Sequence, residues 1–239
     1  MNKNGCLYLI PNTIGNNDIN ISIPSNVKTI VEKLDNFIVE NEKIARRYIK
    51  LISPNKSQDA ITIFKLNKHT SLIEYDSYLN TCLNGKSIGL ISDAGCPGIA
   101  DPGSPIVLKA HELNIKVSPL VGPSSIILAM MSSGMNGQNF AFNGYLPIQK
   151  KERIKKIKFF EKRAFKENQS QVFIETPYRN NSLFSDFIKT LAGSTLLSVA
   201  TDLNLKSEKI KTRSINSWNK SDNEDLNKRP SIFILNVKF

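Results

Sequence analysis

One stretch of the chain carries most of the residues that could do chemistry. Residues 92–105 read SDAGCPGIADPGSP, with three glycines, three prolines and two aspartates in fourteen positions. Glycine lets a ligand approach the backbone closely, and proline fixes a loop shape that needs no ordering on binding. The carboxylate of Asp93 suits a ribose hydroxyl or a cationic group. The pattern therefore predicts a ligand held mainly by main-chain groups.

Two further loops share this composition. They read IPNTIGNND from Ile10 and VGPSS from Val121, and each follows an apolar segment. In an open α/β sheet ligands bind beyond the carboxyl ends of the strands, so three such loops favour a binding site over three unrelated tight turns. The sequence has neither a GxxxxGK[ST] phosphate loop nor a GxGxxG dinucleotide fingerprint. The three cysteines form no CxxC pair and the two histidines complete no zinc spacing, so we expect neither disulfides nor a metal.

Apolar runs and amphipathic segments alternate through the first half of the chain and would position these loops. We expect strands at residues 6–10, 36–39, 61–66, 87–92 and 116–120. We expect helices at residues 25–34, 40–52, 71–83 and 105–113. This order predicts an N-terminal α/β domain, residues 1–120, with a largely parallel sheet.

The second half, residues 121–239, continues the alternation but ends differently. We expect helices at residues 126–135, 150–166 and 181–193, and strands at residues 139–146, 171–176, 194–203, 207–215 and 231–239. The last three strands follow one another without helices, which favours mixed or antiparallel pairing in a C-terminal domain. No apolar run approaches the roughly 18 residues that span a bilayer, and Asn and Pro interrupt the start, so we expect a cytoplasmic protein.

Positive charge is concentrated in the second half. Residues 1–119 hold 13 Lys or Arg against 11 Asp or Glu, whereas residues 120–239 hold 19 against 10. Nine of the basic residues lie in residues 150–166, KKERIKKIKFFEKRAFK. A surface this basic attracts polyanions such as RNA. A solvated helix face explains the same run, so both interpretations stay open.

Helical spacing divides the basic segment into two faces. The predicted buried stripe is Ile154, Ile157, Phe160 and Ala164. If this stripe is buried, the lysine side chains point toward solvent. We expect the other two phenylalanines, Phe159 and Phe165, to pack against the protein rather than to stack on bases.

Five segments together resemble a known superfamily. They are LYLIPNTIGN, GKSIGLISDAGCPGIADPGSPIVLKA, VSPLVGPSSIILAMMSSGM, FAFNGYLP followed by basic residues, and VFIETPYR. Their order and approximate spacing resemble the tetrapyrrole methylase superfamily, and most closely its small-subunit rRNA (cytidine-2'-O-)-methyltransferase branch. The resemblance implies a two-domain α/β, tetrapyrrole-methylase-like fold (a class III S-adenosylmethionine methyltransferase). It also implies a homodimer, with S-adenosylmethionine (SAM) in the interdomain cleft.

The resemblance also implies which residues hold SAM. In this family the loop that matches residues 92–100 wraps the cofactor, and further contacts come from both domains. The implied contacts are Pro11, Ser92, Asp93, Ala94, Gly95, Cys96, Ile99, Ala100, Ser124, Ser125, Ile174, Glu175, Ala200, Pro230 and Ser231. Composition alone points to the first three loops, whereas the positions from Ile174 onward rest on the resemblance.

The predicted substrate loops depart from the family pattern more than the cofactor loops do. An acidic AEDTR-type stretch corresponds to VENEK, which keeps Glu40, and a His- and Glu-rich motif corresponds to FKLNKHT. A ribose hydroxyl has a high pKa, so some group must receive its proton. Glu40 and Glu175 are the candidates. The alternative for each is a carboxylate satisfied by backbone amides or by an arginine such as Arg179.

These observations predict a SAM-dependent methyltransferase that acts on RNA, with a ribose 2'-hydroxyl of ribosomal RNA as the acceptor. A tetrapyrrole or a protein side chain is an alternative acceptor, although a basic domain suits an extended polyanion better. A third interpretation is a SAM- and RNA-binding module without turnover. The substrate loops depart from the family pattern, which favours a module without turnover. The cofactor loops match the family pattern, which favours an enzyme.

Overall fold

The computed structural model describes residues 4–15, 18–67, 69–220 and 224–237. Parts of three predicted segments lie outside these residues: Asn16 and Asn17 of the first loop, Lys68 of FKLNKHT, and the end of the last strand, residues 238–239. The chain divides into two compact units, Met1–Ser124 and Ser125–Phe239. Within the described residues, no helix combines the length and the apolar character that crossing a membrane requires.

The N-terminal unit is built on a five-stranded parallel sheet in the order β3-β2-β4-β1-β5. Its strands are β1 (Cys6–Ile10), β2 (Asn36–Val39), β3 (Thr62–Lys65), β4 (Ile88–Ile91) and β5 (Lys116–Pro119). Its helices are α1 (Ile19–Ser22), α2 (Ser25–Lys33), α3 (Glu42–Ile52), α4 (Leu72–Leu83) and α5 (Ser104–Glu112). The prediction of a largely parallel α/β sheet is confirmed.

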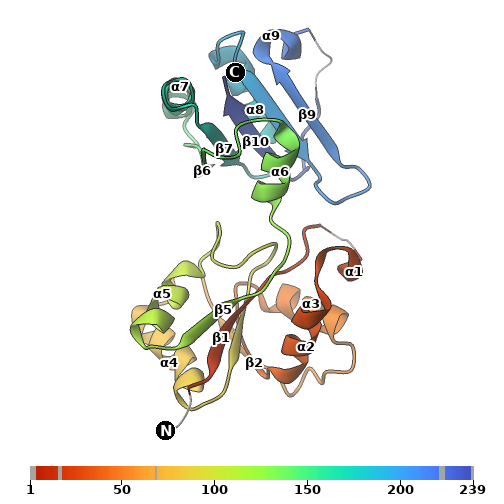
Figure 1. Ribbon diagram of the computed structural model, residues 1–239, viewed down its shortest axis with the longest axis vertical. Helices are drawn as coiled ribbons and strands as arrows, with labels where there is room; N and C mark the ends of the chain where they lie inside the picture. The colour runs from red at the N-terminus through yellow and green to blue at the C-terminus, as the bar shows by residue number, and fades with distance from the viewer. Residues whose placement is uncertain (1–3, 16–17, 68, 221–223, 238–239) are drawn as a thin grey trace. The chain divides into compact units, whose positions relative to one another are not determined.

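Helices cover both faces of this sheet (Figure 1). Successive residues of a strand point to opposite faces. Phe37 and Val39 pack in a core with residues of α2 and α3, whereas Ile38 between them packs with residues of α4 and α5. All three side chains are fully buried. A strand that is buried on both sides favours apolar residues on both faces, which is why residues 37–39, FIV, show no alternation.

The direction in which the chain crosses this sheet reverses between β1 and β4. From β1 the chain continues to β2, which lies on the far side of β4. From β4 it continues to β5, which lies on the far side of β1. The loops that leave these two neighbouring strands therefore diverge. Open α/β sheets bind ligands at such a point, beyond the carboxyl ends of the strands.

The C-terminal unit has a mixed sheet in the order β6-β7-β10-β8-β9, in which only β6 and β7 pair in parallel. Its strands are β6 (Phe140–Tyr145), β7 (Ser170–Ile174), β8 (Leu196–Thr201), β9 (Lys209–Ser214) and β10 (Ser231–Asn236). Its helices are α6 (Ser125–Ser133), α7 (Lys150–Glu167), α8 (Asn180–Thr190) and α9 (Ile215–Trp218). Residues of α6 pack on one face of the sheet, and residues of α7 and α8 pack on the other. The predicted mixed pairing is confirmed.

Helix α7 confirms one expectation about its faces and contradicts another. The predicted stripe faces the core, with Ile157 and Ala164 buried and with Ile154 and Phe160 half-buried. The expectation that the other two phenylalanines pack is wrong for Phe165, which is 76% exposed. It holds in part for Phe159, which is 53% exposed but packs edge-on against Phe160 with ring centroids 5.2 Å apart. At about 100° per residue Phe159 projects opposite the stripe, whereas Phe165 lies at its edge, roughly 20° from Ile154.

One basic residue of α7 belongs to the core, which the sequence analysis did not anticipate. Arg153 is 6% exposed, and its Nε and Nη2 atoms lie 2.7 and 2.6 Å from Oδ2 of Asp186. Its Nη1 atom donates to the carbonyl oxygen of Ile148 at 2.7 Å. Arg153 therefore ties α7 to α8 and is unavailable to a polyanion.

Candidate functional site

The loops after β1 and β4 are hydrogen-bonded to each other. The backbones of Asn12 and Gly95 exchange two hydrogen bonds, with N···O distances of 2.9 and 3.2 Å. The Nδ2 atom of Asn12 donates to the carbonyl oxygens of Ser92 and Asp93, both at 3.1 Å. Because Asn12 is 3% exposed, these bonds are shielded from water. Sequence reasoning missed Asn12, whose one signal is its position directly after Pro11.

Several bonds fix the predicted cofactor loop internally. Gly95 and Ala100 adopt left-handed backbone, with φ of 66° and 62°. The hydroxyl of Ser92 donates to the Gly95 carbonyl at 3.0 Å. The Asp101 carboxylate accepts the N–H of Gly98 at 2.8 Å. Left-handed backbone at a non-glycine residue costs roughly 1–2 kcal/mol, and such strain clusters at functional sites. The loop therefore has a defined shape before any ligand binds.

The third glycine- and proline-containing loop meets the other two at the same edge of the sheet. A Cβ atom on Gly122 would lie 2.2 Å from the Cβ atom of Pro11, so only glycine fits there. The Tyr48 hydroxyl donates to the Pro11 carbonyl at 2.6 Å, and the Cys96 thiol donates to the Pro123 carbonyl at 3.3 Å. All three loops thus converge beyond the carboxyl ends of β1, β4 and β5.

Three carboxylates make this edge electronegative. Glu40 follows β2, and Asp93 follows the neighbouring strand β4. Glu40 is exposed overall, but partial burial of its carboxyl group raises its pKa, and the negative charges of Asp93 and Asp101 raise it further. Burial also raises the pKa of Asp93, although a hydrogen bond from the Asn41 amide opposes the shift. Such an edge suits a cationic ligand group. Among the residues that the structure describes, no three His, Cys, Asp or Glu side chains are grouped to hold a metal ion.

A groove of about 690 Å³ opens beside this edge. Its walls come from the β1 loop, the β4 loop and helix α3. The polar residues of the wall are Asn12, Thr13, Arg47, Tyr48, Lys50 and Asp93. Two cationic side chains of α3, Arg47 and Lys50, therefore line the same groove as Asp93.

The other predicted residues of the long loop differ in exposure. Ser92 and Gly95 are buried, and Asp93 and Cys96 are half-buried. Ala94, Ile99 and Ala100 are exposed. Ser125 is the first residue of α6, and Ser124 precedes it; both are half-buried. The exposed members of the loop leave an apolar surface that a ligand can cover.

The predicted contacts in the C-terminal unit gather at one edge of its own sheet. Strand β10 runs antiparallel to β7 and β8, so its first residues lie beside the last residues of both. Ile232 pairs with Ile174 on one side and with Ala200 on the other. Ser231 pairs with Thr201. The structure thus brings together positions that lie up to 57 residues apart in sequence, Ile174, Glu175, Ala200, Pro230 and Ser231.

The Glu175 carboxylate is engaged by an arginine. Its Oε1 atom accepts hydrogen bonds from Nε and Nη2 of Arg179 at 3.0 and 2.6 Å, and from the Thr176 amide at 2.6 Å. The side chain of Glu175 is 1% exposed. The same oxygen atom thus accepts three hydrogen bonds from within the chain. Of the two alternatives for Glu175, this geometry favours the satisfied carboxylate.

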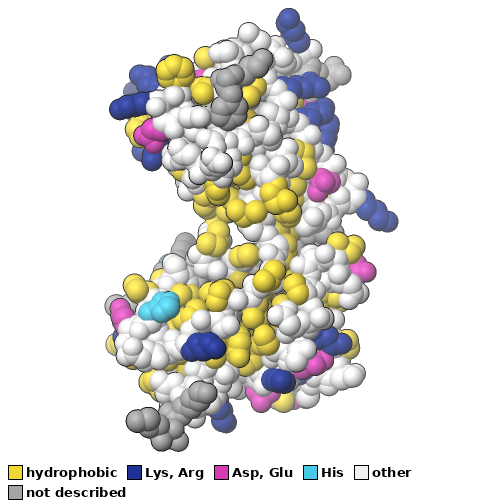
Figure 2. Space-filling model, in the orientation of Figure 1, with side chains coloured by type: hydrophobic (Ala, Val, Ile, Leu, Met, Phe, Trp, Pro, Cys, Tyr) yellow, Lys and Arg dark blue, Asp and Glu magenta, His cyan; other side chains and the backbone are white. Residues whose placement is uncertain are grey.

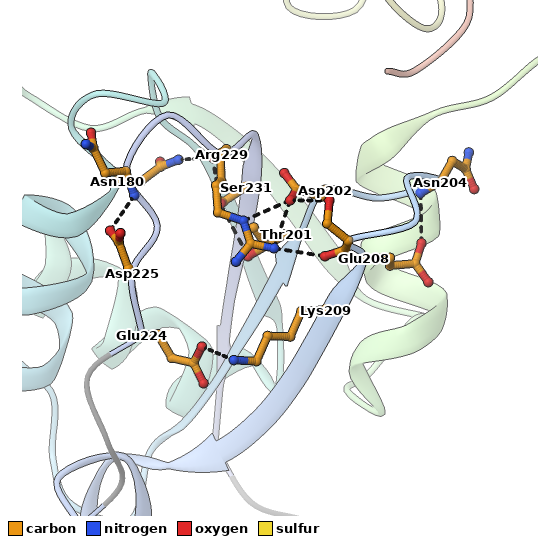
Figure 3. Close-up of polar contacts among 12 residues, drawn as sticks. Asn180, Thr201, Asp202, Asn204, Glu208, Lys209, Glu224, Asp225, Arg229 and Ser231 are labelled. Carbon is orange, nitrogen blue, oxygen red and sulfur yellow. Dashed lines mark hydrogen bonds and ion pairs between the residues drawn. The ribbon is translucent and has the colours of Figure 1, made fainter. Parts of the chain in front are cut away.

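A second ion pair holds the segment that enters β10 (Figure 3). Nε and Nη2 of Arg229 lie 2.8 Å from Oδ2 of Asp202, and Nη2 also donates to the Ser207 carbonyl at 2.8 Å. The Nδ2 atom of Asn180 donates to the Arg229 carbonyl at 2.6 Å. These bonds position Pro230 and Ser231. Sequence reasoning missed the pair, because its partners are 27 residues apart and belong to no local pattern.

Comparison with known proteins identifies a family. The chain is 33% identical to the ribosomal RNA small subunit methyltransferase I of Buchnera aphidicola subsp. Schizaphis graminum over 239 residues, 98% of this chain and 79% of the relative. It is 27% identical over 237 residues to the enzyme of the same name from Escherichia coli O157:H7, 99% of this chain and 79% of the relative. The chain belongs to the ribosomal RNA small subunit methyltransferase I family. No protein-family model matches it.

Solved structures agree on the fold. The methyltransferase CobJ superposes with a TM-score of 0.64 and 12% identity, covering 98% of this chain and 94% of that one. Cobalt precorrin-4 methyltransferase CbiF superposes with a TM-score of 0.59 and 13% identity, covering 96% and 94%. The expected tetrapyrrole-methylase-like fold is confirmed. The family confirms the expected enzyme class, a SAM-dependent methyltransferase.

Proposed function

We propose that this chain transfers a methyl group from SAM to a ribose 2'-hydroxyl of small-subunit ribosomal RNA. The observation that carries the proposal is the 33% identity, along 98% of the chain, to a protein named for methylating that RNA. The basic excess of the C-terminal half supports a polyanionic partner. The proposal includes a homodimer in the cytoplasm that works on the RNA or on the ribosomal subunit.

The residues at the two edges fit SAM. SAM supplies a methyl group carried on a positively charged sulfur, and it presents a ribose and an adenine. The carboxylate of Asp93 suits a ribose hydroxyl or a cationic group, and the preformed backbone of residues 94–100 offers main-chain groups. In the C-terminal unit the apolar positions Ile174 and Ala200 lie beside Ser231, which suits a flat heterocycle.

The proton acceptor that we propose is Glu40. Its raised pKa moves it toward neutral pH, where a general base works best, and it follows the strand next to the one that carries Asp93. Glu175 instead acts as a positioning residue, because Arg179 holds its carboxylate. The preformed loops would hold the methyl donor in a fixed orientation toward the acceptor. Correct orientation of the two reactants removes a large part of the barrier to a displacement reaction.

Binding of the cofactor is tested by isothermal titration with SAM. We expect Asp93→Ala to weaken binding by about 10-fold or more, because a hydrogen bond to a charged group contributes roughly 1.5–3 kcal/mol. The matched control is Asp59→Ala, at an exposed carboxylate that is not among the proposed contacts. Equal affinity in wild type and Asp93→Ala would contradict the role of Asp93.

The acceptor is tested by tritium transfer from labelled SAM to small ribosomal subunits from a strain that lacks this enzyme. Label that survives in a 2'-O-methylated nucleoside after digestion is the expected result. Label in a base would overturn the ribose assignment, and label in a tetrapyrrole or a protein but not in RNA would overturn the RNA assignment. SAM binding without transfer to any of these acceptors would indicate a non-catalytic module.

A further inference from the structure

The solvent side of α7 carries a band of lysines that no acidic residue interrupts. At about 100° per residue, five lysines fall within an arc of roughly 80°. They are Lys151, Lys155, Lys158, Lys162 and Lys166, and all are exposed. The three glutamates of the helix project outside this arc. We call these five residues the lysine band.

Two exposed phenylalanines border the lysine band. By the same helical geometry, Phe165 lies roughly 20° beyond one side of the band and Phe159 roughly 20° beyond the other. They are 76% and 53% exposed, whereas the neighbouring Phe160 packs on the core residue Phe173 with ring centroids 5.1 Å apart. Phe159 packs edge-on against Phe160, with ring centroids 5.2 Å apart, but stays 53% exposed. The core therefore does not explain the exposed surface of the two outer rings, and this exposure costs free energy unless something covers them.

Most of the band is not neutralised by ion pairs among the residues that the structure describes. Lys155 pairs with Glu152 at 3.0 Å, but the other four lysines form no ion pair among the described residues. Next to the band, Nζ of Lys156 lies 5.4 Å from the centroid of the Phe159 ring. Figure 2 shows dark blue and yellow side chains side by side at the edge of the C-terminal unit, over α7.

We propose that this face of α7 docks single-stranded RNA, with lysines of the band on phosphates and with Phe159 and Phe165 stacked on unpaired bases. A positive groove or stripe combined with exposed aromatic rings is the general means by which proteins hold single strands. The inference rests on the proposed function, since it assigns to one helix face the contact with an RNA substrate. It goes further by selecting unpaired nucleotides over duplex.

A second copy of this chain is the competing occupant. If α7 packed against α7 of another copy, two lysine bands with unpaired charges would face each other, and like charges at an interface are unfavourable. Duplex RNA is also a poor fit, because its bases are stacked on one another and present no free ring face to a phenylalanine. Charge complementarity and the exposed rings together therefore favour a single strand.

The lysines are tested by salt dependence. The probe is a fluorescein-labelled 12-nucleotide uridine–cytidine RNA, and the readout is fluorescence anisotropy of the full chain. Single strands lose about 0.7 in the slope of log affinity against log salt for each phosphate contact. Lys158→Gln with Lys162→Gln is expected to flatten the slope by about 1.4. The control is Lys28→Gln with Lys33→Gln on α2, which should leave the slope unchanged.

The phenylalanines are tested at constant salt with the same RNA. Phe165→Ala and Phe159→Ala are each expected to weaken binding by roughly 5- to 100-fold, the range of base stacking, without changing the salt slope. The control is Leu108→Ala, another exposed apolar residue, which is 62% exposed on α5. Unchanged affinity in both phenylalanine variants would overturn the proposal, as would a 12-base-pair duplex that binds as tightly as the single strand.

Two more measurements separate the outcomes. Loss of dimer in Phe165→Ala during sedimentation, with RNA affinity retained, would assign this face to a second copy and overturn the RNA proposal. Methyl transfer to small subunits tests the proposed function apart from the surface. If wild type methylates the subunits and the α7 variants bind and methylate them equally well, only the docking surface fails. If wild type binds the single strand through α7 but methylates no RNA, the proposed function fails and the surface stands.

Discussion

The two units hold their predicted cofactor residues by different means. In the N-terminal unit the loops are fixed by backbone hydrogen bonds and by close approaches at glycine, such as the exchange between Asn12 and Gly95. In the C-terminal unit ion pairs between side chains hold the corresponding edge, a local pair of Arg179 with Glu175 and a long-range pair of Arg229 with Asp202. The backbone contacts of the N-terminal unit give its loops a defined shape. The ion pairs of the C-terminal unit keep charged groups paired where those groups are buried.

The difference follows from the two sheets. In a parallel sheet all carboxyl ends meet at one edge, so the loops that follow the strands converge without further help. In the mixed sheet the start of β10 meets the ends of β7 and β8, and the entering segment needs its own anchors. The charge differs as well, because the unit with the antiparallel strands also carries most of the excess of lysine and arginine. The N-terminal site, held by its backbone, and the C-terminal site, held by ion pairs, should therefore respond differently to mutation.

The largest expected effect is on the ion pairs of the C-terminal unit. Arg153→Met leaves the buried Asp186 with only its longer contact to the exposed Lys150, at 3.8 Å, which should cost about 3–5 kcal/mol in urea unfolding. Adding Asp186→Leu should recover much of the loss, because the uncompensated charge is removed. The control in the other unit is Arg46→Met, whose half-buried pair with Glu42 should contribute under about 1 kcal/mol. Equal losses at Arg153 and Arg46 would contradict the contrast between the units.

The next effect tests the close approaches of the N-terminal unit. Gly122→Ala forces a methyl group against Pro11 and should destabilise the protein by about 1–3 kcal/mol, the usual cost of overpacking. It should also weaken SAM binding in the titration, because Pro11 belongs to the proposed site. Gly137→Ala is the control, since a Cβ there meets no atom within 4 Å. A Gly122→Ala variant that binds SAM like wild type would show that the loop tolerates a shift.

A smaller effect is expected at the amide that joins two loops. Asn12→Ala removes the donor to Ser92 and Asp93 and leaves their carbonyl groups without that partner, which should cost about 1–2 kcal/mol. SAM affinity should fall together with stability, because the amide fixes the start of the cofactor loop. Thermal unfolding and titration of the same sample measure both. A loss of stability with unchanged affinity would separate the amide from the site.

The smallest effect is a dependence of stability on pH at the carboxylate edge. The pKa values of Glu40 and Asp93 are raised in the fold, so their charged forms are disfavoured there. Their contribution to stability is complete below the ordinary pKa of about 4 and is lost as pH rises through the folded pKa. Asp93→Asn should therefore match wild type near pH 4 and should melt roughly 1–3 °C higher at pH 7. A variant that is less stable than wild type at pH 7 would contradict this sign.

Residue patterns alone predicted the alternation of strands and helices, the parallel first sheet and the three loops that bear the N-terminal site. These features are local: residues 37–39, FIV, are apolar at every position, and glycine and proline mark the places where the backbone turns. Residues 92–105 could be assigned to a ligand for the same reason, since loop composition and the preceding strand lie next to each other in the chain.

Tertiary structure alone decided the contacts that join distant segments. The bonds of Asn12 to the β4 loop, the pairing of Arg153 with Asp186 and the anchoring of Arg229 by Asp202 connect residues 27 to 81 positions apart. The exposure of Phe159 and Phe165 was also decided there, because a phenylalanine packs only if a neighbouring element supplies a surface. Spacing along a helix gives the direction of a side chain, but what lies in that direction depends on the fold of the whole unit.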